Sequence, residues 1–286
     1  MARKQKRAIT IQDISCVGRC SLTVALPILS AGGVETVILP TAILSTHTGG
    51  FTGYTFRDLG EDIDPICAHW LELGIQADAL YTGYLGSQEQ QQQIARIFDE
   101  FSANDPIILV DPAMADAGQL YPAFDLDFAR GMTSLVAKAT LTVPNITEAS
   151  LLLDKPYPGD DFDQAWVEQT LRELAALGPS QVVLTGVFFE PDKLGAAAYD
   201  ASLDSVSYYF TERIPGYFHG TGDIYSSALL AALLNDKSLV EAIAIACEFT
   251  VGAIRQTVAA GTEPRYGVDF EDEIPHLLKM LGRVSQ

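Results

Sequence analysis

The sequence has 286 residues, of which 48% are apolar, and 37 acidic against 18 basic side chains give a formal net charge of −19 at pH 7. A chain of this length and composition can bury a large core, which excludes the fibrous and disordered classes. Because so negative a surface repels phosphates, we expect no nucleic-acid partner. The basic stretch at residues 1–7 lacks a following apolar run long enough for export or insertion, so we expect a cytoplasmic protein without a membrane partner.

The four cysteines are few for this length, and in the cytosol we expect them to be reduced thiols without disulfides. Buried or partly buried positions are the usual ones for free cysteine, and we expect them here for Cys16, Cys20, Cys67 and Cys247. The spacing of Cys16 and Cys20 lacks the further His or Cys that a metal finger or iron–sulfur site needs.

From residue 8 onward, short β-prone runs alternate with longer runs of helical period, which predicts an α/β fold with a mostly parallel sheet flanked by helices on both faces. We expect one domain over residues 1–286, with residues 1–7 as a frayed tail. In chain order, the expected elements are strand 8–13, helix 21–31, strand 34–40, helix 63–73, strand 79–82, helix 87–101, strand 107–111, helix 125–137, strand 141–143, helix 163–177, strand 182–185, an edge hairpin of 195–199 and 205–210, and helices 223–234 and 239–258.

Most of the expected helices begin at Ser or Asp, whose side chains can cap exposed amides. In the helix over 223–234, Ile224, Ala228, Ala231 and Ala232 predict one narrow apolar stripe of mostly small residues.

Polar residues follow each expected strand, and in open α/β sheets ligands bind beyond the carboxyl ends of the strands. These residues are Asp13, the run from Thr46 to Gly50, Gly83 and Tyr84, the run from Asp111 to Asp116, the run from Asn145 to Glu148, and Thr185 with Gly186.

The sharpest feature is Gly220-Thr221-Gly222-Asp223, which leads directly into a helix of small residues. Glycines there let main-chain amides converge on an anion at the positive end of the helix, and a first-turn carboxylate can accept a proton from a substrate hydroxyl in phosphoryl transfer. The alternative is an ordinary Asp N-cap after a glycine turn. The third glycine of a dinucleotide-binding fingerprint is missing, and no Gly-Lys-Ser/Thr sequence of a P-loop exists.

These residues carry a resemblance. The stretch HGTGDIYSSALLAALL resembles the signature of the ribokinase-like superfamily, and VDPAMAD, TVPNITEA and YTGYLGS are similar to the branch that holds pyridoxal kinases and hydroxymethylpyrimidine kinases. LSTHTGG and TGYLGS are closer to pyridoxal kinase, and SCVGRCSLTVALPILSAGG resembles the bacterial pyridoxamine kinase-like group. The similarity spans residues 8 to 260, roughly the whole fold.

The resemblance implies a role for particular positions. Gly220, Thr221 and Gly222 match the anion hole, and Asp223 matches the base that activates a hydroxymethyl group for attack on the γ-phosphate of ATP. Positions that hold Mg²⁺, mostly through water, match Asp111, Asp116 and Glu148. Nucleotide contacts match Asn145, Thr185 and Gly222, and the vitamin pocket matches Asp13, His47, Thr48 and Tyr84.

Plainer interpretations stay open for some of these side chains. Asp111 before Pro112 could only start a turn, Glu148 could only stabilise the start of a helix, and Tyr84 and His47 could be packed side chains with satisfied hydrogen bonds. Asp13 departs from the family pattern, in which a serine contacts the ring. A carboxylate could pair with a protonated pyridine nitrogen or an aminomethyl group, or could recognise an aminopyrimidine.

The resemblance implies an ATP-dependent kinase that phosphorylates the 5′-hydroxymethyl group of pyridoxal, pyridoxine or pyridoxamine, with Mg²⁺ as cofactor and the need for K⁺ left open. The alternative within the same mechanism is a hydroxymethylpyrimidine kinase of thiamine synthesis. An alternative of another class is a non-catalytic protein that binds the vitamer phosphate, against which the intact Asp223, Asp111 and Glu148 argue. A sugar or nucleoside kinase is disfavoured, because the first half of the chain lacks the glycine pair used around a ribose. Relatives are commonly dimers, so we expect a homodimer.

Overall fold

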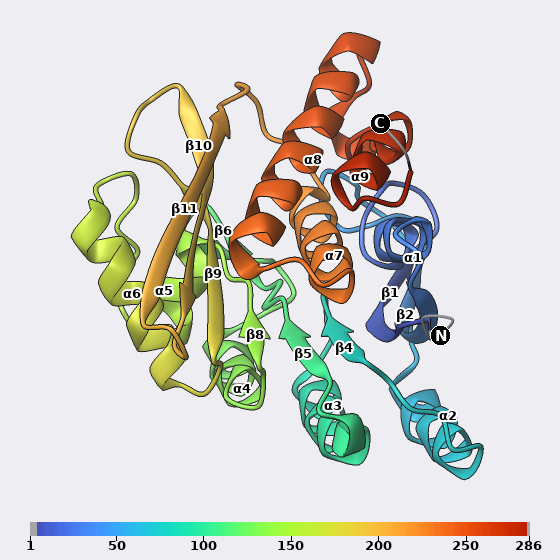
Figure 1. Ribbon diagram of the computed structural model, residues 1–286. Coiled ribbons are helices and arrows are strands. Elements are labelled where there is room, and N and C mark those ends of the chain that lie inside the picture. The colour runs from blue at the N-terminus through green and yellow to red at the C-terminus, as the bar shows by residue number, and fades with distance from the viewer. Residues whose placement is uncertain (1–4, 285–286) are drawn as a thin grey trace.

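A twisted central sheet runs through the molecule, with a layer of helices on each face (Figure 1). The structure is a computed structural model that describes residues 5–284. In these residues nine strands form one sheet in the order β11-β10-β9-β8-β5-β4-β1-β2-β3. The six strands from β9 to β2 are parallel, whereas β10, β11 and β3 join the two edges antiparallel. The predicted α/β class and the edge hairpin are confirmed.

The described residues contain the following elements in chain order: β1 (Arg7–Ser15), α1 (Leu22–Ala31), β2 (Glu35–Leu44), β3 (Phe56–Asp58), α2 (Gly60–Glu72), β4 (Ala79–Thr82), α3 (Gln88–Glu100), β5 (Ile107–Val110), β6 (Ala115–Asp116), β7 (Gln119–Leu120), α4 (Leu126–Val136), β8 (Leu141–Thr142), α5 (Ile146–Leu152), α6 (Gln164–Ala176), β9 (Gln181–Val187), β10 (Lys193–Asp200), β11 (Ser205–Glu212), α7 (Thr221–Leu234), α8 (Leu239–Ala260) and α9 (Ile274–Met280), with short 3₁₀ turns at 102–104, 264–266 and 271–273.

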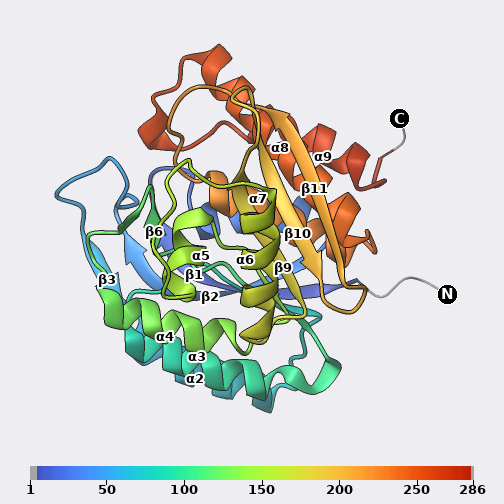
Figure 2. The same ribbon diagram turned by 90° about the vertical axis from the view of Figure 1, so that its left-hand side faces the viewer.

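Alternation along the strands builds one apolar core on each face of the sheet. Ala8 packs with α1, α7, α8 and α9 on one face, and its neighbour Ile9 packs with α2, α3, α4, α5 and α6 on the other. Figure 2 shows this division, with α2, α3 and α4 as one layer below the sheet and α8 and α9 above it. Helices therefore cover both faces of the sheet, and the loops that follow the carboxyl ends of the parallel strands are the place where a ligand can bind.

Helix α7 lies between α1 and α8 and is buried nearly all round from Ile224 to Leu234. The predicted single apolar stripe is therefore wrong, because neighbours contact this helix on several sides. The helix also begins at Thr221 rather than Asp223, and its N-cap is Gly220. Helix α8 has the length and apolar character of a membrane span, but more than half of its most apolar window is buried inside the fold, as in a core helix.

Several local expectations need correction. Arg7 opens β1 and Lys6 forms an ion pair with Asp78, so the expected tail cannot extend past residue 5, and residues 1–4 lie outside the described range. The four cysteines are free as expected, but Cys16 is exposed rather than buried. Ser87, Asp125 and Asp163 cap their helices as predicted, whereas the side chain of Ser21 makes no capping hydrogen bond.

Candidate active site

A cavity of about 560 Å³ lies along the carboxyl ends of the parallel strands and reaches across the N-terminus of α7. Every candidate site residue of the sequence analysis lines it, so the fold brings together segments from across the chain. They are Asp13, His47, Thr48, Tyr84, Asp111, Asp116, Asn145, Glu148, Thr185, Gly220, Thr221, Gly222 and Asp223.

The N-terminus of α7 forms one wall of the cavity, and its two glycines have different reasons to be glycine. Gly220 has a φ of 76°, a left-handed conformation that residues with a side chain rarely adopt. A Cβ there would also lie 2.0 Å from the carbonyl oxygen of Arg19, which leaves no room for a side chain. A Cβ on Gly222 would meet nothing within 4 Å, so this position opens onto the cavity. Main-chain N–H groups at the start of α7 are thus accessible to an anion.

Asp223 lies in the first turn of α7 and is not its cap. Its Oδ2 atom accepts a hydrogen bond of 2.9 Å from the main-chain N–H of Ser21. Burial raises the pKa of Asp223 to about 7, and the charges of Asp111 and Asp13 act in the same direction, while the hydrogen bond from Ser21 opposes them. A carboxylate with a pKa near neutrality, beside an anion site, is suited to accept a proton from a hydroxyl group.

Asp13 lines the same cavity, and the residue is only 3% exposed. Ser21 Oγ donates to Oδ1 at 2.5 Å and Ser15 Oγ donates to Oδ2 at 2.8 Å. Burial raises the pKa of Asp13, and the two serine hydroxyls counteract that effect. Neither Ser15 nor Ser21 was predicted as a site residue. Both follow Asp13 within eight residues, but only the structure shows that Ser21 turns its hydroxyl towards Asp13 instead of capping α1.

Asp111, which follows β5, and Glu148, in the first turn of α5, form a second acidic group. Ser226 Oγ donates to Asp111 Oδ2 at 2.8 Å, and burial raises the pKa of Asp111 to about 6. Burial also raises the pKa of Glu148, with a further contribution from the charge of Asp111. The negative charge on one of these two neighbouring buried carboxylates therefore disfavours ionisation of the other, and a bound cation would stabilise both in the charged form.

The predicted Asn145-to-Glu148 pattern is a capping box of α5. Asn145 Oδ1 accepts from the Glu148 N–H, and Glu148 Oε2 accepts from the Asn145 N–H, each at 2.9 Å. Glu148 Oε1 accepts from the Met114 N–H at 3.1 Å, and Asn145 Nδ2 donates to the Ala115 carbonyl at 2.8 Å. Both side chains thus fix the segment that leads to Asp116, in addition to lining the cavity.

The donor set fits a hydrated divalent cation better than a directly ligated one. Across residues 5–284, no three Asp, Glu, His or Cys side chains come close enough to form a direct metal-binding set. The cavity nevertheless has six carboxylates in its lining: Asp13, Asp111, Asp116, Glu148, Glu212 and Asp223. No Lys or Arg of the described chain lines it. A polyphosphate could not bind beside so many negative charges without a cation, and Mg²⁺ keeps much of its water when it binds.

His47 lines the cavity with both ring nitrogens already engaged. Nδ1 accepts from the Gly49 N–H at 3.1 Å, so Nε2 carries the proton and donates to the Arg265 carbonyl at 2.6 Å. Burial lowers the pKa of His47, although its hydrogen bond to Arg265 and the charge of Asp13 oppose that effect. The neutral ring ties the loop after β2 to the segment after α8. Its contact with a ligand could only be through the ring face or edge.

Two other predicted pocket residues, Thr48 and Tyr84, line the mouth of the cavity. Thr48 is exposed, and Tyr84 is half-buried with its ring 5.3 Å from that of Phe124. The same two residues also line a smaller hollow next to the cavity, so this side of the mouth is built from loops. Such loops are where a solvent-excluding closure would occur in a kinase.

The end of the cavity beside β10, β11 and α8 is mostly apolar, and no sequence motif predicts it. Thr185 also lines the cavity and pairs with Asn145 in an isolated bridge. The lining of this end comes from the edge hairpin, the segment after it and helix α8: Leu194, Gly195, Thr211, Glu212, Ile214, Cys247, Thr250, Val251 and Ile254. A flat aromatic base would fit such a lining, because apolar walls with few polar groups are typical of nucleotide-base sites.

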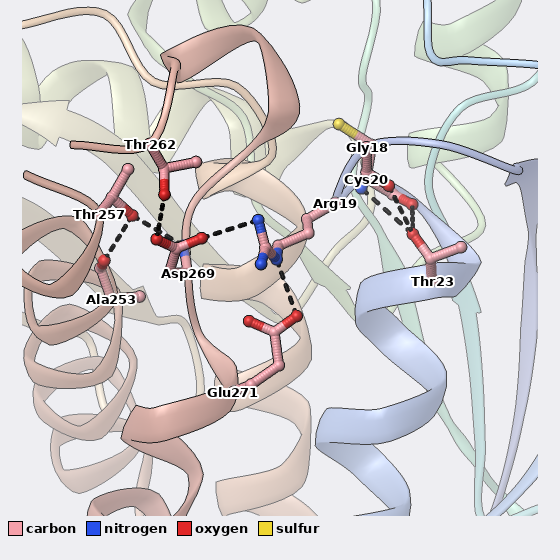
Figure 3. A network of polar contacts seen from close by, with 9 residues as sticks. All are labelled: Gly18, Arg19, Cys20, Thr23, Ala253, Thr257, Thr262, Asp269 and Glu271. Atoms are coloured by element: carbon pink, nitrogen blue, oxygen red, sulfur yellow. Dashed lines mark hydrogen bonds and ion pairs between the residues drawn. The ribbon is translucent and has the colours of Figure 1, made fainter. Parts of the chain in front are cut away.

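An ion-pair network holds the loop that carries Ser21, as Figure 3 shows. Arg19 Nη1 lies 2.8 Å from Asp269 and its Nε lies 2.7 Å from Glu271. The Arg19 main-chain N–H also donates to the Tyr266 carbonyl at 3.0 Å. On the other side of this loop, the Arg19 carbonyl contacts Gly220. The loop between β1 and α1 is therefore fixed between the C-terminal segment and the start of α7.

Comparisons with known proteins agree with this geometry. The sequence profile described as phosphomethylpyrimidine kinase matches residues 29–267. A provisionally assigned phosphomethylpyrimidine kinase from Bacteroides thetaiotaomicron is 36% identical, with a TM-score of 0.93 over 97% of this chain and 95% of that one, and a second crystal form of it was solved with pyridoxal. Pyridoxal kinase from Lactobacillus plantarum is 31% identical, with a TM-score of 0.89 over 98% and 99% of the two chains. The hydroxymethylpyrimidine/phosphomethylpyrimidine kinase of Bacillus subtilis is 25% identical over 78% of this chain and 79% of its own.

Proposed function

The chain belongs to the phosphomethylpyrimidine kinase family and is an ATP-dependent phosphotransferase of the ribokinase-like fold, and from that premise we propose that its acceptor is a B6 vitamer, phosphorylated on the 5′-hydroxymethyl group. The observation that carries the proposal is Asp223, which stands in the first turn of α7 beside the open N–H groups and faces the cavity. Pyridoxal in the Bacteroides relative supports the choice of acceptor.

In the proposed reaction the vitamer lies between Asp13 and Asp223. Asp223 accepts the proton of the vitamer's hydroxymethyl group. The hydroxymethyl oxygen attacks the γ-phosphorus of ATP, the bond from that phosphorus to the β-γ bridging oxygen breaks, and ADP leaves. The N–H groups at Gly220, Thr221 and Gly222 stabilise the charge on the transferred phosphoryl group. Asp111 and Glu148, with Asp116, would hold Mg²⁺, which would supply positive charge against the phosphates when bound. The apolar end near α8 receives the adenine ring.

Hydroxymethylpyrimidine is the second candidate acceptor, and it is favoured by the family profile and by the Bacillus subtilis relative. The mechanism would be unchanged, because this acceptor also presents a hydroxymethyl group on an aromatic ring. Asp13 is compatible with both, since a buried carboxylate can accept from a protonated ring nitrogen or from an amino group.

The test is a side-by-side assay of the purified chain with MgATP and each of four acceptors: pyridoxal, pyridoxine, pyridoxamine and hydroxymethylpyrimidine. ADP release and the mass of the product are measured together. We expect phosphorylated vitamer, with kcat/KM highest for one of the three B6 compounds. A hundredfold preference for the pyrimidine would reassign the acceptor, and binding of vitamer phosphate without ATP turnover on any acceptor would replace the enzyme by a binding protein.

The second arm of the test changes Asp223→Asn, which keeps the shape of the side chain and removes the base. Loss of a general base costs about two to four powers of ten in turnover, with ATP affinity near normal. Asp127→Asn is the matched control, because Asp127 is also a first-turn carboxylate, on α4, but it is exposed and lies outside the cavity. Near-normal turnover of Asp223→Asn would place the base elsewhere.

A further inference from the structure

Ser21 makes two hydrogen bonds that join the acceptor pocket to the candidate base. Its hydroxyl donates to Asp13 Oδ1 at 2.5 Å, and its main-chain N–H donates to Asp223 Oδ2 at 2.9 Å. Asp13 lies at the end of β1 and Asp223 lies at the start of α7, more than two hundred residues apart in sequence. One residue therefore contacts both carboxylates through different groups.

The backbone of Ser21 is strained in order to make these contacts. Its torsions are φ 55° and ψ −131°, a region that L-residues other than glycine rarely occupy. A glycine would adopt this conformation without strain, yet a glycine would lack the hydroxyl that Asp13 accepts. Strain of this kind persists where the surrounding structure determines it, and at a ligand cavity it points to a function.

The surrounding loop leaves Ser21 little freedom to relax. Two residues upstream, Arg19 is held by Asp269 and Glu271 on one side of the loop, as drawn in Figure 3. Immediately downstream, the Ser21 carbonyl accepts from the N–H groups of Val24 and Ala25, which begins helix α1. The Cys20 carbonyl, which shares a peptide plane with the Ser21 N–H, accepts from Thr23 Oγ1 at 2.8 Å, and the side-chain bond to Asp13 is the further contact that holds Ser21 in this orientation.

We propose that Ser21 is a positioning residue for the kinase reaction, which couples acceptor recognition at Asp13 to the orientation of the base Asp223. An acceptor whose ring nitrogen or amino group donates to Asp13 binds a carboxylate whose orientation is already fixed by the hydrogen bond from Ser21. The Ser21 N–H then keeps Asp223 Oδ2 occupied, and Oδ1 is the oxygen that faces the substrate hydroxyl. This inference rests on the proposed function, because it assigns the parts of the same site.

Ser15 supplies the matched control. Its hydroxyl donates to the other oxygen of Asp13 at 2.8 Å, and the structure gives it no contact with Asp223. Ser15→Ala and Ser21→Ala thus each remove one hydrogen bond to Asp13, but only the second touches the residue that orients the base. The two variants separate weaker acceptor binding from a misplaced base.

The experiment measures kcat and KM for pyridoxal and pyridoxamine, with MgATP, in Ser15→Ala, Ser21→Ala, Ser21→Gly and Asp13→Ala, and in the double variant of Asp13→Ala with Ser21→Ala. We expect both Ser21 variants to lower kcat by about tenfold to a hundredfold with the KM for ATP unchanged, the effect of losing one hydrogen bond to a charged group. Ser15→Ala should raise the acceptor KM and change kcat by about threefold at most. The double variant should lose no more kcat than the worse single one, since the two residues act as a unit.

Stability is the second readout. Ser21→Gly relieves the backbone strain, so it should melt at a higher temperature than Ser21→Ala while its kcat stays equally low or lower. A purely structural role would move stability and kcat in the same direction. Equal kcat losses in Ser15→Ala and Ser21→Ala, or losses in Ser21→Ala and Asp13→Ala that add, would overturn the inference. If Asp223→Asn is inactive and Ser21→Ala is normal, only this inference fails; if the unchanged chain turns over none of the four acceptors, the proposed function fails with it.

Discussion

Replacing Asp223 by Asn should make the folded chain more stable at the same time as it removes turnover. The reason is that burial raises the pKa of Asp223 from its ordinary value of 3.8 to about 7. An acid whose pKa is raised on folding destabilises the folded state, fully above the folded pKa and not at all below the unfolded one. The destabilisation therefore grows between pH 4 and 7 and is constant at higher pH.

The size of the effect follows from the shift. A change of about three units corresponds to about 4 kcal/mol at pH 8, at 1.36 kcal/mol per unit, and the same relation gives about 2 kcal/mol at pH 5. These are upper limits, because solvent in the cavity and relaxation of the site reduce them. Asparagine can still accept from the Ser21 N–H, so the variant keeps that hydrogen bond. A gain of half the upper limit, about 2 kcal/mol, would raise Tm by about 3 °C at pH 8 in a chain of this size.

The assay is thermal unfolding of both proteins at pH 8 and pH 5 in buffer without metal or nucleotide. We expect a Tm gain at pH 8 that shrinks at pH 5. Asp127→Asn controls for the loss of one negative charge from a chain of net charge −19, because Asp127 is exposed and its pair with Arg130 is worth little. A gain that is independent of pH, or no gain at all, would refute the idea that Asp223 is held charged against its burial.

Three further outcomes follow from the same site. The value of kcat/KM should fall about tenfold per unit as pH drops below 7, because Asp223 must be deprotonated to accept the proton; a pH–rate profile checks this, and a flat profile down to pH 5.5 would contradict it. Gly220→Ala should cost about 1–3 kcal/mol of unfolding free energy and most turnover, since its Cβ would meet the Arg19 carbonyl, which denaturant titration and kinetics measure. Asp111→Asn should raise Tm in metal-free buffer and reduce the Tm gain on adding MgCl₂, because the buried charge beside Glu148 is removed; an unchanged magnesium response would exclude Asp111 from the metal site.

The sequence predicted the elements that carry a period or a turn signal. The strand over 79–82 has the predicted bounds, and the long helices begin and end within a few residues of their expected positions. Helix α5 was missed because Ile146–Leu152 has only seven residues, too few for a helical period to show. Strands β6 and β7 have two residues each and depend on one pairing, which no local pattern encodes.

The candidate site divides in the same way. Residues at strand ends and at the start of α7 could be predicted, because topology alone places them at one edge of the sheet. The hydroxyl of Ser21 could not, since the residue reads as a helix cap and only its backbone torsion turns it towards Asp13. The apolar end beside α8 could not either. Its residues are ordinary core residues in sequence, and their exposure to the cavity depends on how β10 and α8 pack.

The unfavourable features of this fold collect at the cavity. Asp13, Asp111, Glu148 and Asp223 are carboxylates whose pKa is raised by burial, and Ser21 has a strained backbone. No lysine or arginine of the described chain lines the cavity to neutralise them, although Arg19 and several other basic side chains form ion pairs outside it. The two apolar cores on the faces of the sheet are large enough to tolerate this cost. In the proposed function a cation and a hydrogen-donating acceptor would complement these charges, so their binding should stabilise the folded chain.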